Sequence, residues 1–139
     1  MYDEALKFAT ERHSDQKRWD GSPYINHPRR VAEKFSDDLR KTVAVLHDVV
    51  EDTDITLEDL EKLGIPGSVV GAVKAITKRK DENYLDYILR VSRNPLATKV
   101  KIEDLNDNMK GATNQRREKY ELAQHILKES QDGSTSKEN

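Results

Sequence analysis

The residues most able to do chemistry lie together in one short segment, VAVLHDVVED. On a regular helix, with about 100° per residue, its histidine and three acids fall within an arc of about 140°. These residues are His47, Asp48, Glu51 and Asp52. Asp48 and Asp52 repel each other at i,i+4, and no Lys or Arg stands three or four residues from Asp48 to offset this. Something else must compensate these charges.

Two interpretations of the acidic segment are open. It could form a solvated surface, because further acids follow up to Glu61. The apolar residues in TVAVLHDVV argue against that, since they would bury the helix, and a buried uncompensated charge is costly. A divalent cation would compensate it. Histidine together with aspartate suits a first-row ion such as manganese, iron or zinc better than calcium, which prefers oxygen ligands alone.

A cation needs ligands from elsewhere in the chain, and cysteine cannot supply them because the sequence contains none. His27 is one candidate, since it lies in the segment PYINHP, where two prolines make the backbone rigid. Asp104 is another. A helical wheel places it beside Lys101 and Asn108, on the polar face of a segment whose opposite face is apolar.

Single residues elsewhere carry weaker signals. Trp19, the only tryptophan, lies in a loop near these candidates and could stack on a purine, shield the site from solvent or pack in the core. We interpret His13 and His125 as packed or surface residues, because a lone helical histidine is seldom a ligand. The basic residues 78–80 are typical of a helix end, where the helix dipole favours positive charge.

Helix-capping residues predict where the elements that carry these side chains begin. The candidate caps are Asp37 or Asp38, Thr56 with Asp59, Asn83, and Asn94 before Pro95. The expected helices cover residues 3–13, 29–35, 57–63, 84–93, 95–109 and 115–128, and one more runs through the acidic segment to residue 52. Val69, Val73 and Ile76 have helical spacing, although their β-branched side chains leave a strand possible. No segment alternates cleanly enough for a sheet, so the predicted class is all-α.

Length and composition limit the remaining possibilities. At 139 residues the chain is expected to form one compact domain over residues 1–129. Residues 130–139 contain no apolar side chain and are expected to form a disordered tail. The charge of −2, from 24 basic and 26 acidic residues, argues against a nucleic-acid partner. No segment resembles a membrane span or a signal peptide, so we expect a cytoplasmic protein without membrane contact.

Separate blocks of the sequence, in order, resemble one known family. They are FATERHSDQKRWDGSPYINHPRRVAE, VAVLHDVVEDTDITLEDL and KVKIEDLNDNM. Together they are similar to the hydrolase domain of the RelA/SpoT-type alarmone enzymes, in the metal-dependent HD superfamily, and most of all to the stand-alone small alarmone hydrolases. The resemblance implies a helical HD-domain fold. It also implies removal of the 3′-pyrophosphate of guanosine tetraphosphate or pentaphosphate (ppGpp or pppGpp), leaving GDP or GTP plus pyrophosphate.

The resemblance further implies roles for individual residues. One Mn²⁺ per chain would be held by His27, His47, Asp48 and Asp104. Glu51 and Asp52 match the acidic pair that acts beside the metal on the attacking water. Arg18 and Asn108 match residues that contact the nucleotide, and Trp19 is a further candidate substrate contact.

Several positions depart from the family pattern. They are Asp15, Trp19 and Asp20 in the first block, Glu103 and Asp107 in the last, and Lys110 and Gly111 directly after it. Asp107 stands where the family often has histidine. Because base recognition depends on such positions, two alternatives stay open: an HD phosphohydrolase acting on another phosphorylated nucleotide or dinucleotide, and a non-catalytic nucleotide-binding module. The presence of both Glu51 and Asp52 favours an enzyme.

Overall fold

The structure is a computed structural model that describes residues 1–138, with the backbone alone for residues 132–138. Within this range there are nine helices. They are α1 (Tyr2–Arg12), α2 (Asn26–Glu33), α3 (Asp38–Leu46), α4 (Val49–Asp52), α5 (Leu57–Lys62), α6 (Gly67–Ile76), α7 (Tyr84–Ser92), α8 (Pro95–Met109) and α9 (Asn114–Glu138). The one β-pairing found in this range is an isolated bridge between Lys17 and Pro23. The predicted all-α class is confirmed.

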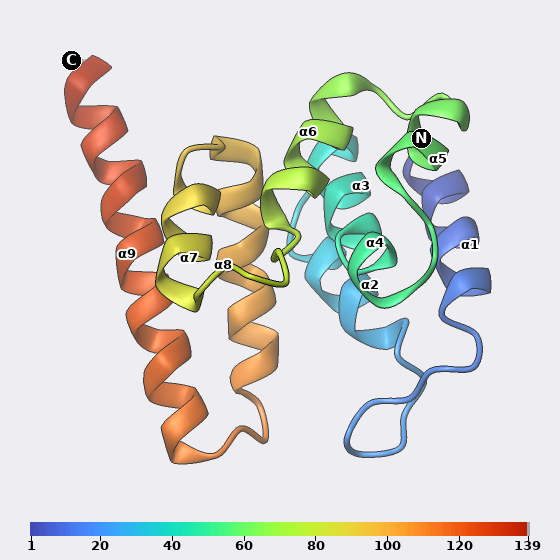
Figure 1. Ribbon diagram of the computed structural model, residues 1–139, viewed down its shortest axis with the longest axis horizontal. Coiled ribbons are helices and arrows are strands. Elements are labelled where there is room, and N and C mark those ends of the chain that lie inside the picture. Colours follow the sequence, from blue (N-terminus) through green and yellow to red (C-terminus); the bar gives the residue numbers. More distant parts are fainter. Residues whose placement is uncertain (139) are drawn as a thin grey trace.

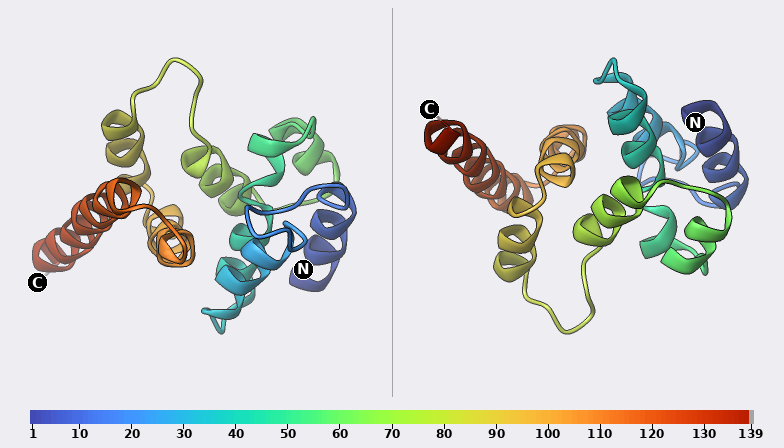
Figure 2. Two further views of the ribbon diagram at one scale, coloured as in Figure 1. Left: turned by 90° about the horizontal axis from the view of Figure 1, so that it is seen from below. Right: turned by 90° about the horizontal axis from the view of Figure 1, so that it is seen from above.

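Helix α8 lies in the middle of the fold and joins two parts, one formed by α1–α6 and the other by α7 and α9 (Figure 1). On one side it packs against α2, α3 and α6, and on the other against α7 and α9. Figure 2 shows the two parts side by side, with the C-terminal end of α9 projecting away from the rest. The hydrophobic core includes both α3 and α8, since residues 43–46 on α3 and Leu105 on α8 are fully buried. Burial of such apolar side chains is the main favourable contribution to folding.

The helix boundaries follow the capping residues that the sequence predicts. Asp37 accepts a hydrogen bond from a first-turn amide of α3, and Asn83 and Asn94 do the same for α7 and α8. Thr56 and Asp59 exchange hydrogen bonds as a complete capping box at the start of α5. Each cap satisfies an amide that the first turn of a helix leaves without a partner.

Residues 69–76, whose β-branched side chains also allow a strand, lie in helix α6. Val69, Val73 and Ile76 are all buried there. Their spacing places them on one face of the helix, so packing outweighs the modest preference of β-branched side chains for strands.

The predicted helix through residue 52 is wrong in one respect, because it is interrupted at His47 and Asp48. Helix α3 ends at Leu46 and α4 begins at Val49. The His47 ring donates from Nδ1 to the Ala44 carbonyl. In a continuous helix the same carbonyl would accept a hydrogen bond from the backbone amide of Asp48, so the ring competes with that amide. The turn brings His47 Nε2 to 3.1 Å from Asp48 Oδ2. On a regular helix these two consecutive side chains would point about 100° apart.

The end of the chain contains the predicted disordered tail, residues 130–139. Ser130 lies within α9, and its Oγ donates a hydrogen bond to the Ser92 carbonyl at 3.1 Å. The helical backbone continues to Glu138. The side chains of residues 132–138, and residue 139 as a whole, lie outside what the structure describes, so disorder there stays a prediction. No helix within residues 1–138 is both long enough and apolar enough to span a membrane.

Candidate active site

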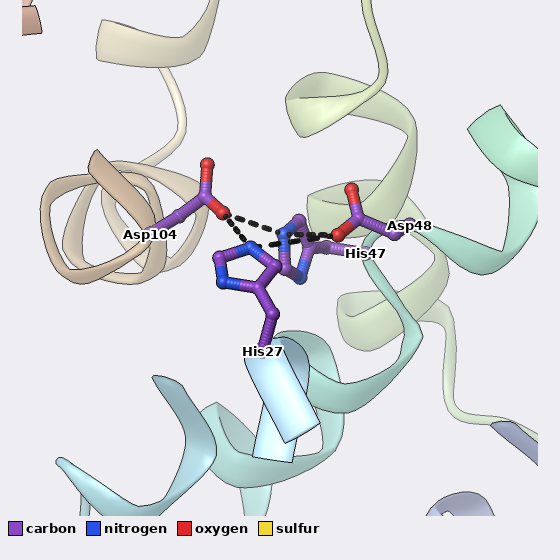
Figure 3. A group of neighbouring side chains, drawn as sticks. All are labelled: His27, His47, Asp48 and Asp104. Carbon is purple, nitrogen blue, oxygen red and sulfur yellow. Dashed lines mark hydrogen bonds and ion pairs between the residues drawn. The ribbon is translucent and has the colours of Figure 1, made fainter. Parts of the chain in front are cut away.

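Four side chains from three parts of the chain converge in the interior (Figure 3). His27 comes from α2, Asp104 from α8, and His47 and Asp48 from the turn between α3 and α4. One imidazole nitrogen or carboxylate oxygen of each lies within 4.8 Å of the others. His27 Nε2 and His47 Nε2 lie 2.7 Å and 3.1 Å from the same oxygen, Oδ1 of Asp104. The structure thus brings together the four residues predicted to bind the metal, and all four are buried.

The histidines and aspartates of this cluster stabilise each other's charged forms. Burial lowers the pKa of His47, but the charges of Asp48 and Asp104 outweigh it and raise that pKa well above its ordinary value. Hydrogen bonds to carboxylates likewise raise the pKa of His27 against the effect of burial. Burial raises the pKa of Asp104, but neighbouring cations hold it well below its usual range.

The donor set of the cluster fits a divalent metal ion. Two imidazole nitrogens and two carboxylates, buried together, are the ligand types that first-row divalent ions accept. Asp48 and Asp104 would repel each other strongly in this environment without a cation between or beside them. The cluster could therefore hold one metal ion.

Two residues without a predicted role support the aspartates of the cluster. Tyr24 donates a hydrogen bond from its hydroxyl to Asp48 Oδ2 at 2.7 Å. Lys101 donates from Nζ to Asp104 Oδ2 at 2.8 Å. The sequence placed Lys101 on the same helix face as Asp104, which is a signal for this ion pair. For Tyr24 the signal was its place in the rigid segment before His27, but nothing local indicated its partner.

A third supporting residue, Asp107, stands behind His27. Its Oδ2 accepts a hydrogen bond from His27 Nδ1 at 2.6 Å. Arg30 donates to both oxygens of the same carboxylate, at 2.9 Å and 3.0 Å. The sequence marked Asp107 only as a departure from the family pattern.

The two predicted catalytic acids lie on α4, just beyond the cluster, and both side chains reach solvent. Partial desolvation and the charge of Asp48 raise the pKa of Glu51 to about 7, and the same causes raise the pKa of Asp52. Gln16 fixes the end of α4, because its Nε2 donates to the Asp52 carbonyl at 3.0 Å. His13 donates from Nδ1 to Gln16 Oε1 at 2.9 Å and is buried, so it is a packed residue as predicted.

The three predicted substrate contacts line one cavity of about 230 Å³. Arg18 Nη2 donates to Asn108 Oδ1 at 3.3 Å, and Asn108 lies one turn beyond Asp104 on α8. Trp19 is 71% exposed, which excludes a core role, and its ring lies directly over Gly111. Two further cations, Lys110 and Arg116, also line the cavity. The cavity is therefore positively charged, and Trp19 and Tyr120 are its aromatic lining residues.

No family model matches the chain, but individual proteins do. The guanosine-3′,5′-bis(diphosphate) 3′-pyrophosphohydrolase MESH1 of Drosophila melanogaster is 34% identical over 138 residues, which covers 84% of this chain and 76% of that protein. The chain belongs to the RelA/SpoT-type ppGpp hydrolase family. Its resemblance to that family, predicted from the sequence blocks, is thereby confirmed.

Two further comparisons place the chain within the RelA/SpoT-type family. A solved structure, described as a metazoan ortholog of SpoT that hydrolyses ppGpp, matches with a TM-score of 0.75 and 29% identity, and covers 93% of this chain and 84% of that one. A guanosine-3′,5′-bis(diphosphate) 3′-pyrophosphohydrolase of Aquifex aeolicus is 38% identical over 119 residues, or 76% of this chain. The chain spans only 17% of the length of that longer relative.

Proposed function

We propose that the protein is a Mn²⁺-dependent (p)ppGpp 3′-pyrophosphohydrolase, which converts ppGpp or pppGpp to GDP or GTP plus pyrophosphate. The observation that carries the proposal is the convergence of two histidines and two aspartates in one buried cluster, with two acids on the next turn. The Drosophila relative, of which this chain covers 76%, is named for this reaction.

The buried cluster would hold the Mn²⁺, the histidines through Nε2 and the aspartates through carboxylate oxygens. When bound, such an ion screens phosphate charge and lowers the pKa of water toward neutrality. Lys101 engages Oδ2 of Asp104, which leaves Oδ1 facing the two histidines. Tyr24 orients Asp48 through its hydroxyl group.

Glu51 is the residue we propose as general base toward the attacking water. Burial raises the pKa of Glu51, and a carboxylate of raised pKa takes a proton near neutral pH and releases it again more readily than one of ordinary pKa. We propose that Asp52, the next residue on α4, orients the water. Its backbone is held in place through Gln16.

The positively charged cavity is where we propose that the nucleotide binds. Arg18, Lys110 and Arg116 provide charges that attract a polyphosphate, which the acids of α4 alone would repel. Asn108 offers an amide for a hydrogen bond to the nucleotide, and we propose that Trp19 stacks on the purine, since its ring is exposed at the cavity.

Product analysis tests the proposal. Purified protein is stripped with a chelator, reconstituted with Mn²⁺ and given ppGpp, and we expect GDP and pyrophosphate in equal amounts. Release of single phosphates, or no turnover, would contradict the proposal. Ranking a panel of phosphorylated nucleotides by kcat/KM distinguishes ppGpp from the alternative substrates, and nucleotide binding without turnover would indicate the non-catalytic module.

A matched pair of variants tests the proposed role of Glu51 as general base. Glu51→Gln should lower kcat by about 100-fold or more, the usual contribution of a general base, while Mn²⁺ stays bound. Glu58→Gln removes one exposed acid from the neighbouring helix α5 and should leave kcat unchanged. Equal activity of the two variants would show that Glu51 is not the base.

We also propose that the enzyme acts in the cytoplasm on a small nucleotide, with no nucleic acid or membrane as a partner. Its near-neutral charge of −2 supports the absence of a nucleic-acid partner.

A further inference from the structure

Asp107 is a buried carboxylate on α8, and its contacts reach both the proposed metal ligands and the cations around them. Its side chain is 6% exposed. Oδ2 lies 2.6 Å from His27 Nδ1, and Arg30 binds both oxygens through Nε and Nη2. Lys110 Nζ and Arg18 Nη1 lie further out, at 3.6 Å and 3.8 Å. No other residue described has this combination of contacts with a proposed ligand and with three flanking cations.

The contacts that Arg30 makes with Asp107 fix how the hydrogen bond between Asp107 and His27 is made. Arg30 donates from Nε and Nη2 to the two carboxylate oxygens, and a guanidinium group can only donate, so both oxygens of Asp107 act as acceptors. A carboxylate held in this way has no hydrogen to donate. The hydrogen in the 2.6 Å contact therefore belongs to His27 Nδ1.

The location of that hydrogen determines which nitrogen of His27 is left for a metal. A neutral imidazole with hydrogen on Nδ1 has its lone pair on Nε2. Nε2 is the nitrogen that faces Asp104 Oδ1 at 2.7 Å and Asp48 Oδ2 at 3.8 Å. His47 is arranged in parallel, since its Nδ1 donates to the Ala44 carbonyl and its Nε2 faces the same two aspartates.

The two histidines differ in the kind of acceptor behind them. His47 has a neutral backbone carbonyl, which no side-chain substitution can remove. His27 has a charged side chain, which orients the ring and makes its Nε2 a stronger electron donor. Arg30 holds that carboxylate at both oxygens, so it cannot rotate away from the ring.

We infer that Asp107 is a positioning residue for the metal site: it fixes the Nδ1–H tautomer and the ring orientation of His27, so that Nε2 is offered to the metal. This inference rests on the proposed metal-dependent function.

Metal affinity, measured without substrate, tests the role of Asp107. Asp107→Ala should weaken Mn²⁺ binding by about 10–100-fold in calorimetric titration, the usual cost of losing such a partner. Asp107→Asn keeps the shape and a neutral acceptor, so its Mn²⁺ affinity should fall between the alanine variant and wild type. Glu103→Gln removes one acid from the same helix without touching His27 and should bind Mn²⁺ as wild type does.

Nuclear magnetic resonance of the ring nitrogens separates positioning from a loss of fold. With diamagnetic Zn²⁺ bound, wild-type His27 should carry its hydrogen on Nδ1, and the exchange of that hydrogen with water should become much faster in the asparagine variant. The Nδ1–H of His47 should stay unchanged and serves as an internal reference. Because the asparagine variant preserves the packing, it gives the result even where the alanine variant does not fold.

The outcomes separate this inference from the proposed function. If wild-type protein binds Mn²⁺ and both Asp107 variants bind it equally well, the role of Asp107 is refuted and the metal site stands. The same holds if His27 carries its hydrogen on Nε2 in the Zn²⁺-bound wild type. If the wild type binds no Mn²⁺, the metal-dependent function fails and the inference fails with it.

Discussion

Replacing Gly111 with alanine should displace the only tryptophan of the protein. Gly111 has φ +76°, a left-handed conformation, and its Cα lies under the indole ring of Trp19. A Cβ at this position would lie 2.6 Å from Cη2 of that ring and still closer to Cζ2. Carbon atoms in contact need about 3.5 Å or more. One of the two groups must move, and Trp19 is free to do so because it is 71% exposed.

The expected magnitudes follow from the same two features. The left-handed backbone costs an alanine about 1–2 kcal/mol, and the smaller entropy of the unfolded chain returns about 0.4–1 kcal/mol. The net loss should be about 1 kcal/mol, or about 4 °C in Tm. If Trp19 stacks on the base, an interaction usually worth about 1–3 kcal/mol, its displacement should raise KM for ppGpp by at least about fivefold.

Gly64→Ala is the matched control for Gly111→Ala. Gly64 has φ +84° and no atom within 4 Å of an added Cβ, so it carries the same backbone cost without the collision. Both variants should lose similar stability in thermal unfolding. Only Gly111→Ala should make Trp19 fluorescence more accessible to acrylamide quenching and raise KM. If both variants quench and turn over alike, the ring does not rest on Gly111 as described.

Three further predictions concern stability. Lys101→Met should lower the free energy of unfolding of the metal-free protein by about 3 kcal/mol in urea, because it removes the ion pair between Lys101 and the buried Asp104, and Mn²⁺ should restore part of the loss. An unchanged urea midpoint would contradict this. Leu105→Ala should lower the free energy of unfolding by about 3 kcal/mol by opening a cavity in the core, while leaving KM unchanged. A loss below about 1 kcal/mol would show that the core around Leu105 is loosely packed. Hydrogen bonds from Arg90 lower the pKa of Glu82 from 4.5 to about 2. The contribution of this pair to folding stability is therefore complete above about pH 4.5 and is lost as pH falls toward 2. Glu82→Gln should therefore lower Tm at pH 6, with the difference from wild type vanishing near pH 2; a constant difference would contradict the pairing.

The helix boundaries could be predicted from the sequence because capping is local. Asn83, Asn94 and the Thr56–Asp59 pair each bond to amides within three residues, so the signal and its effect lie in the same short segment. The break at His47 could not be predicted in this way. A wheel assumes an unbroken helix, and the hydrogen bond from the His47 ring to Ala44 changes the backbone that the wheel takes for granted.

The site was predictable only in part for a related reason. Periodicity shows which face of a helix is polar, and it correctly placed Lys101 beside Asp104. It does not show which residue from another helix that face will meet. Asp107 and His27 are 80 residues apart in the chain, and their contact depends on how α2 packs against α8. Such a partner becomes visible only in three dimensions.

Titration of the metal-stripped protein with Mn²⁺, with pyrophosphate release from ppGpp followed at each addition, tests the central claim most directly. One cluster of four ligands predicts that activity rises linearly and stops rising at about one Mn²⁺ per chain, and that His47→Ala abolishes both the binding and the release. Full activity in the metal-stripped protein, or pyrophosphate release by His47→Ala at the wild-type rate, would contradict the account.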